Sequence, residues 1–150
     1  MDMNEIYSQI IIEHSRSKKH KYVLEQADMT EPGHNPSCGD EIELQLRMDG
    51  DVITEAAFTG IGCAISQASA SLMCGLIEGR TAEEAKALCE TFIGMIRREI
   101  TDDDTLAVLE DAQALSNVSN LPARVKCAVL AWHTLQEMIN SRSQKESALS

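Results

Sequence analysis

Hydrophobic and polar positions alternate without a break over residues 41–48 of this 150-residue chain. One face of that segment carries only aliphatic or methionine side chains, namely Ile42, Leu44, Leu46 and Met48. A period of two residues predicts a strand with one buried face. The next residues, 49–51, have the composition of a tight turn, so we expect residues 52–59 to return as the second strand of a hairpin.

Much of the remaining chain has the hydrophobic spacing of amphipathic helices. We expect helices over about residues 3–15, 64–78, 82–99 and 122–139, with a further one after residues 102–104. The helix ends carry ordinary capping signals. Gly79 follows the second helix, Thr81 and Glu84 can form a capping box for the third, and Pro122 opens the last.

Other segments lack any periodicity. Residues 31–36 contain two prolines and a glycine, which argue against regular structure there. Residues 116–120 are polar and are expected to form a loop, and residues 141–150 a frayed, disordered tail. Because the strands come early and the helices late, the chain is expected to form one α+β domain over residues 1–140, with helices on one face of an antiparallel sheet.

Composition and charge narrow the functional classes. The longest apolar runs are far shorter than the ~20 residues of a membrane span, and no export signal is visible. We therefore expect a soluble, cytoplasmic protein with no membrane partner. The formal net charge of −11 repels phosphate backbones, so nucleic acid is not an expected partner either. The basic cluster over residues 16–21 is expected to be a solvated loop, with His14 and His20 on the surface.

Cysteine content points to metal or sulfur chemistry. The chain has five cysteines, an odd number, and an unexported protein keeps its thiols reduced, so a disulfide framework is not expected. Cys74 and Cys89 fall inside predicted helices and are expected to pack in the core, as free cysteines commonly do. His133, in the last helix, is also expected to be structural.

Cys38 and Asp40 lie two residues apart in a segment that cannot be regular. Pro36 stiffens the approach to this segment, and Gly39 permits a sharp turn, so both side chains can point toward the same place. His34 is close enough in sequence to serve as a ligand in place of Asp40, and the spacing leaves that alternative open.

Cys63 and Cys127 each lie near the start of a predicted helix. The unpaired N–H groups and the positive dipole end of a helix favour a thiolate, as do the neighbouring Arg124 and Lys126. Three such thiolates and one carboxylate suit a tetrahedral zinc site. Thiolate-rich sites accept iron as well, so the residue types alone do not identify the metal.

Taken together, these segments resemble the IscU/NifU-type scaffold family. The motifs that carry the resemblance are Asn35–Asp40, Gly60–Ser66 and Arg124–Trp132, in this order, and the likeness runs from the first helix to about Ile139. The resemblance implies a SufE/NifU-like α+β fold with a three-stranded antiparallel sheet. It also implies that Cys38, Asp40, Cys63 and Cys127 are the metal ligands.

Within that family the chain is most similar to the SufU branch. Members of the scaffold type carry a histidine just before the third cysteine, where this chain has Lys126, and their segment between the second and third cysteines is shorter. The SufU resemblance implies a zinc-dependent sulfurtransferase that accepts persulfide sulfur from a SufS-type, pyridoxal-phosphate-dependent cysteine desulfurase and supplies downstream SUF assembly proteins. Cys38, on its loop bounded by proline and glycine, is the expected sulfur acceptor, and Arg124 is expected to orient the partner or stabilise the thiolate.

Two other functions use the same residues. The first is an IscU-type scaffold that assembles and transfers a [2Fe–2S] cluster without sulfurtransferase activity, since thiolates also bind iron–sulfur clusters. The second is a structural zinc module that serves protein interaction. Metal analysis of anaerobically purified protein separates the first from a zinc protein, and a desulfurase assay separates the second from a sulfurtransferase.

Overall fold

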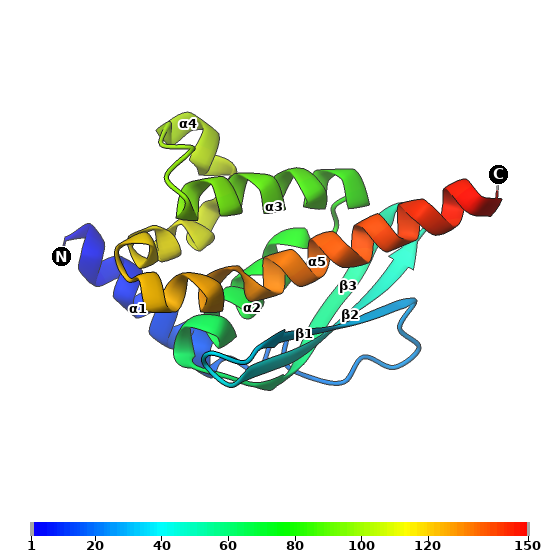
Figure 1. The fold of residues 1–150 in the computed structure, drawn as a ribbon, viewed down its shortest axis with the longest axis horizontal. Coiled ribbons are helices and arrows are strands. Elements are labelled where there is room, and N and C mark those ends of the chain that lie inside the picture. The colour runs from blue at the N-terminus through cyan, green and yellow to red at the C-terminus, as the bar shows by residue number, and fades with distance from the viewer. Residues whose placement is uncertain (1, 150) are drawn as a thin grey trace.

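A three-stranded antiparallel sheet lies beneath a layer of helices in the computed structural model, which describes the backbone of residues 2–149 (Figure 1). The strands are β1 (Met29–Asn35), β2 (Asp40–Asp49) and β3 (Val52–Ile61), in the order β1-β2-β3. This arrangement confirms the expected α+β fold with helices on one face of the sheet.

The central hairpin forms as its sequence pattern predicts. Leu44 pairs with Phe58 across β2 and β3, and both side chains are buried against the helices. Gly50 closes the turn with a φ of 61°, a left-handed conformation that glycine adopts without strain. The aliphatic face of β2 therefore forms the floor of the core.

The expectation of irregular structure over residues 31–36 is wrong, because most of that segment belongs to β1. β1 is an edge strand that pairs only with β2 among the described residues, and Pro32 lies opposite Glu43 there. A proline is tolerated at an edge because one side of the strand needs no ladder hydrogen bonds. Packing against the last helix explains why residue 33 is a glycine, because a side chain there would collide with Thr134.

The helices are α1 (Met3–Arg16), α2 (Ala64–Ile77), α3 (Ala82–Ile96), α4 (Asp103–Leu106), the 3₁₀ segment η1 (Ala107–Asn120) and α5 (Pro122–Leu149). Their caps match the sequence signals. The backbone N–H of Glu84 donates to the Thr81 side chain, and the Glu84 carboxylate accepts from the Thr81 N–H, which completes the capping box of α3. Gly79 follows α2 with a φ of 84°.

Two helical segments before α5 differ from expectation. α3 ends at Ile96 rather than near residue 99, and Arg98 has a left-handed φ of 60°. The expected loop over residues 116–120 is instead the last part of η1, where Val118 is buried. Burial of Val118 in the core favours helical structure in this segment, although most of its residues are polar.

The last helix is longer than expected. The sequence predicts an end near Ile139 and a frayed tail over residues 141–150, but α5 runs to Leu149, and residue 150 lies outside the described residues. No glycine or proline interrupts this segment, and Arg142 donates hydrogen bonds to the Asp51 carboxylate and the Gly50 carbonyl in the β2–β3 turn. Within residues 2–149, no helix combines the length and apolar character that crossing a bilayer requires.

The core holds α5 against its neighbours through Trp132. The indole ring is fully buried and stacks on Phe92 of α3 with ring centroids 4.2 Å apart. Its Nε1 donates to Ser69 Oγ on α2 at 2.9 Å, so three helices meet at this side chain. Cys74 and Cys89 lie in the same core, which confirms the expectation that they pack there, and burial raises the pKa of both thiols.

His20 is buried, contrary to the expectation that it lies on the surface, and His14 is only partly exposed. His20 is only 5% exposed, and its Nδ1 lies 3.2 Å from the Ala56 carbonyl oxygen. The backbone holds it there, because the Phe58 N–H donates to the His20 carbonyl and draws the segment onto β3. His14 is half-buried, with Nδ1 2.9 Å from Ser71 Oγ. The lysines beside His20 are at least partly exposed, as expected for a solvated loop.

Candidate metal centre

Three chain segments meet at one end of the sheet, where β1 ends, β2 begins and β3 ends. Cys38 lies in the turn between β1 and β2, and Asp40 is the first residue of β2. Cys63 is the N-cap of α2, directly after β3, and Cys127 lies near the start of α5. The antiparallel topology therefore brings together residues that are far apart in sequence.

Cys38, Asp40 and Cys127 form a compact group. One potential ligand atom from each lies within 4.8 Å of the others, and the two sulfurs are 3.0 Å apart. Asp40 and Cys127 are fully buried, whereas Cys38 is partly exposed. The group thus has a closed floor and one accessible thiol.

Cys63 borders this group and contacts two of its members. Its backbone N–H donates to Asp40 Oδ1 at 2.9 Å, and its sulfur contributes to the raised pKa of the Cys127 thiol. Its sulfur is not among the three ligand atoms that lie within 4.8 Å of one another. Of the four residues singled out from the sequence, the structure therefore places three in one group and the fourth beside it.

His34, the alternative to Asp40, lies outside the group. Its side chain is exposed, and its Nε2 lies 3.5 Å from the Glu41 carboxylate. Successive residues of a strand face opposite ways, so when Asn35 points inward His34 points outward. The geometry favours Asp40 over His34.

Asn35, which was not singled out from the sequence as a site residue, contacts two members of the group through its side chain. Its side chain is 5% exposed, and its Nδ2 lies 3.4 Å from Asp40 Oδ2 and 3.7 Å from Cys127 Sγ. Its carbonyl accepts from the Cys38 N–H at 3.3 Å. The available signal was its place in the same short motif as Cys38 and Asp40.

Gly62 allows the loops to approach closely. A Cβ at this position would lie 2.7 Å from Asp40 Oδ1 and would collide with the Ser66 hydroxyl. Gly39 has a φ of 70°, which lets the chain turn sharply between Cys38 and Asp40. Both glycines are therefore required for the shape of the centre.

A position near a helix start predicts a lowered thiol pKa for Cys127, but the surroundings of this thiol raise its pKa. Burial raises the pKa of its thiol, and hydrogen bonds with Cys38, Asp40 and Cys63 raise it further. Arg124 is exposed, and a hydrogen bond to Cys127 together with the charges of the Cys63 and Cys38 sulfurs raises the pKa of its guanidinium. The Arg124 side chain is thus directed toward the sulfurs. A bound cation would reverse the effect of burial and favour the Cys127 thiolate.

The donor set fits a thiophilic metal. Thiolates with one carboxylate are typical ligands of zinc, and thiolates also hold iron in iron–sulfur clusters. Asp40 accepts hydrogen bonds on both of its oxygens, which fixes the orientation of a buried carboxylate. Cys74 and Cys89 are packed in the core and are not part of this set.

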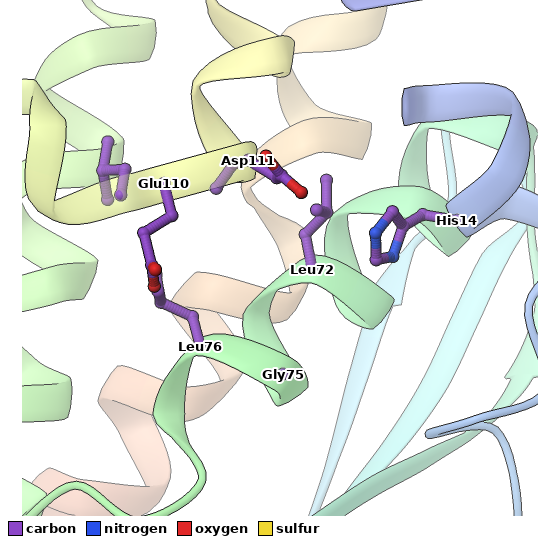
Figure 2. A pocket seen from close by; sticks show the side chains of 8 residues that line it. His14, Leu72, Gly75, Leu76, Glu110 and Asp111 are labelled. Carbon is purple, nitrogen blue, oxygen red and sulfur yellow. The ribbon is translucent and has the colours of Figure 1, made fainter. Parts of the chain in front are cut away.

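Several hollows lie outside the thiol group in the part of the chain that the structure describes, and two of them border residues singled out from the sequence. A cavity of about 220 Å³ is lined by α1, α2 and η1, with His14, Glu110 and Asp111 at its edge (Figure 2). A groove of about 520 Å³ runs between β1 and α5, and Asn35 and Lys126 are among the residues that line it. Lys126 therefore faces this groove.

Comparison with known proteins gives consistent matches. Residues 6–148 match the family model described as the NifU-like N terminal domain. The iron–sulfur cluster assembly scaffold protein IscU of Thermotoga maritima is 43% identical, over 93% of this chain and 96% of its own length. The zinc-dependent sulfurtransferase SufU of Bacillus subtilis is 38% identical, over 91% of this chain and 90% of its own length.

A solved structure supports the same likeness. The crystal structure of a protein named as an iron–sulfur cluster assembly scaffold for the SUF system, from Fervidobacterium islandicum, superposes with a TM-score of 0.82 at 38% identity. The match covers 92% of this chain and 99% of that one.

Proposed function

This chain belongs to the NifU-like N-terminal domain family, and we propose that it serves iron–sulfur cluster assembly as a zinc-dependent sulfurtransferase. Its sulfur donor is a pyridoxal-phosphate-dependent cysteine desulfurase of the SufS type, and downstream SUF assembly proteins receive the sulfur. The observation that carries the proposal is a partly exposed thiol, Cys38, placed 3.0 Å from the buried Cys127 in a group suited to a thiophilic metal.

Cys38, Asp40, Cys63 and Cys127 are the proposed zinc ligands. Zinc bound there keeps the thiols deprotonated and protects them from oxidation. Cys63 joins the set by a side-chain rotation, since its backbone is already tied to Asp40. The residues would hold the metal at the meeting point of β1, β2, α2 and α5.

Cys38 is the proposed sulfur acceptor because its backbone is the freest of the three. Cys63 caps α2, and Cys127 is fully buried in α5. Cys38 lies in a turn, where its thiol donates to the Ala123 carbonyl (S···O distance 3.7 Å) and accepts from the Cys127 thiol. The turn can thus carry the sulfur outward without unfolding a helix.

The transfer exchanges one S–S bond for another. The Cys38 thiolate attacks the outer sulfur of the desulfurase cysteine persulfide, and the new S–S bond forms at Cys38 as the old one breaks. The desulfurase cysteine leaves as a thiolate, so no external oxidant or reductant is needed. Arg124, directed toward the sulfurs, would stabilise the anionic sulfurs during this exchange.

Exposed apolar side chains beside the centre support docking of a protein partner. Ile61, two residues before Cys63, is 67% exposed, and Leu121, just before α5, is 53% exposed. Large exposed apolar side chains next in sequence to the segments that carry the proposed ligands are suited to contact with another protein surface.

The alternative is an IscU-type scaffold that assembles a [2Fe–2S] cluster. The 43% identity to a protein named as such a scaffold favours it. Lys126 favours sulfur transfer, because members of the scaffold type carry a histidine at this position.

A desulfurase assay with metal analysis separates the two functions. Protein purified anaerobically is assayed for zinc, iron and acid-labile sulfide, and its effect on alanine release by a SufS-type desulfurase is measured. We expect colourless zinc protein that accelerates turnover, and a Cys38→Ala variant that does not. Brown protein with acid-labile sulfide and no acceleration would establish the scaffold function instead.

A further inference from the structure

The Asn35 side chain contacts the two most buried residues of the candidate metal centre at once. Its amide nitrogen lies 3.4 Å from Asp40 Oδ2 and 3.7 Å from Cys127 Sγ. The sulfur distance is within the range of an N–H···S hydrogen bond, which is longer than one to oxygen.

The fold leaves Asn35 little freedom. It is the last residue of β1, it pairs with Asp40 across the sheet, and its carbonyl accepts the Cys38 N–H that closes the intervening turn. With only 5% of its surface exposed, the amide cannot exchange these contacts for water. The inward direction follows from the pleat of the strand.

The chemistry of the two acceptors explains the residue type. A carboxylate oxygen and a sulfur both accept hydrogen bonds, and an amide NH₂ supplies two hydrogens without adding charge. An aspartate here would place a second carboxylate against Asp40, and a serine has one hydrogen on a shorter arm. Cys63 secures the other Asp40 oxygen from its backbone, so the carboxylate is held from two sides.

We propose that Asn35 is a positioning residue of the metal centre, which holds Asp40 and Cys127 in place and withdraws electron density from the Cys127 sulfur. A hydrogen bond to a thiolate lowers electron donation by that sulfur, both to a metal and to an electrophile. Cys127 is thereby kept as a permanent ligand, and Cys38, which receives no such bond from Asn35, remains the better nucleophile. The inference rests on the metal binding in the proposed function and not on sulfur transfer.

Cobalt(II) substitution of the full chain tests this role. Cobalt bound to thiolates absorbs by sulfur-to-metal charge transfer, and removal of an N–H···S bond moves that absorption to longer wavelength. We expect this shift in Asn35→Ala, a smaller shift in Asn35→Ser, and a loss of zinc affinity of about 10–100-fold in Asn35→Ala by chelator competition, as for other groups that orient metal ligands.

Gln45 supplies a matched control. It is another buried amide on the sheet, 8% exposed, and bonds the Leu24 N–H and carbonyl rather than the thiol group. Gln45→Ala should lower thermal stability and leave both the cobalt spectrum and the zinc affinity unchanged. A shift confined to the Asn35 variants therefore separates positioning from general destabilisation.

The outcomes separate this inference from the proposed function. An Asn35→Ala protein that binds cobalt with the wild-type spectrum and affinity overturns the role of Asn35 alone. If Asn35→Ala does not fold, Asn35→Ser is measured in its place. A wild-type cobalt spectrum and affinity in that variant would likewise overturn the role of Asn35. Failure of the wild-type protein to bind cobalt or zinc would overturn the metal centre, and this inference with it.

Discussion

The sulfur atoms of Cys38 and Cys127 lie 3.0 Å apart, although 89 positions separate the two residues along the chain. Cys38 belongs to the turn between β1 and β2, and Cys127 is a buried residue near the exposed start of α5. This pairing of a partly exposed thiol in a turn with a fully buried one is the basis of the proposed sulfur transfer.

Substitution of Cys38 should abolish sulfur acceptance. After incubation with a desulfurase and cysteine, mass spectrometry of wild-type peptides should find the persulfide on Cys38. Cys38→Ala should carry no persulfide and should fail to accelerate alanine release. Cys89→Ala, which removes a core thiol, serves as control and should still accept sulfur. Persulfide formation at the native rate in Cys38→Ala would show that the acceptor is a different cysteine.

Loss of the Arg124 guanidinium should slow transfer without releasing metal. Because this side chain is directed toward the sulfurs, Arg124→Ala should reduce the transfer rate about tenfold, equivalent to ~1.4 kcal/mol. Arg124→Lys should restore part of the rate, because it returns the charge. Lys126→Ala, which alters a charge in the neighbouring groove, should have a smaller effect. Equal rates for wild type and Arg124→Ala would remove Arg124 from the mechanism.

A charge at Ile61 should weaken partner docking. Ile61→Asp places a carboxylate on an exposed apolar position beside Cys63, so the concentration needed for half-maximal desulfurase activation should rise at least about fivefold, or ~1 kcal/mol. Zinc content should not change. Val108→Asp alters a comparably apolar, exposed residue on η1 and should leave activation unchanged. An unaltered activation curve for Ile61→Asp would place the docking surface elsewhere.

Removal of zinc should destabilise the protein without unfolding it. The sheet and helices share a core centred on Trp132 that does not include the ligand turn, so helical circular dichroism should persist in the metal-free protein at a lower melting temperature. Cys74 and Cys89 should stay protected from alkylation, whereas Cys38 should react. A random-coil spectrum after chelation would show that the metal is required for folding.

Buried thiols should make stability fall in alkali. The ordinary thiol pKa is 9.0, and burial raises the pKa of Cys74 and Cys89 above it. Above pH 9 the unfolded chain therefore loses thiol protons that the native protein keeps, and each thiol lowers the free energy of unfolding by up to ~1.4 kcal/mol per pH unit. Below pH 9 their contribution is constant.

Cys89→Ala isolates this effect from other groups that titrate in alkali, such as Tyr22, whose pKa burial and a hydrogen bond to Glu55 raise to about 12. The variant should be less stable at pH 7, because it leaves a cavity, yet its stability should fall less steeply above pH 9. Chemical denaturation at several pH values measures both slopes, and parallel slopes would contradict the assignment.

Local signals were sufficient for much of the fold. The alternation in residues 41–48 predicted β2, and Thr81 with Glu84 predicted the start of α3, because strand faces and helix caps depend on residues only a few positions apart. For β1, the local sequence signals gave the wrong prediction. Pro32 argues against a strand, but at a sheet edge its missing N–H costs little.

The sequence by itself determined which residue types could form a metal centre: three cysteines at turns or helix starts and one carboxylate. The ligand set remains a prediction. Only the tertiary structure decided that Cys38, Asp40 and Cys127 lie together, that Cys63 borders them, and that Asn35 bonds two of them. The reason is physical. Such contacts join segments distant in sequence, and they exist only after strand pairing and the packing of α5 have brought those segments together.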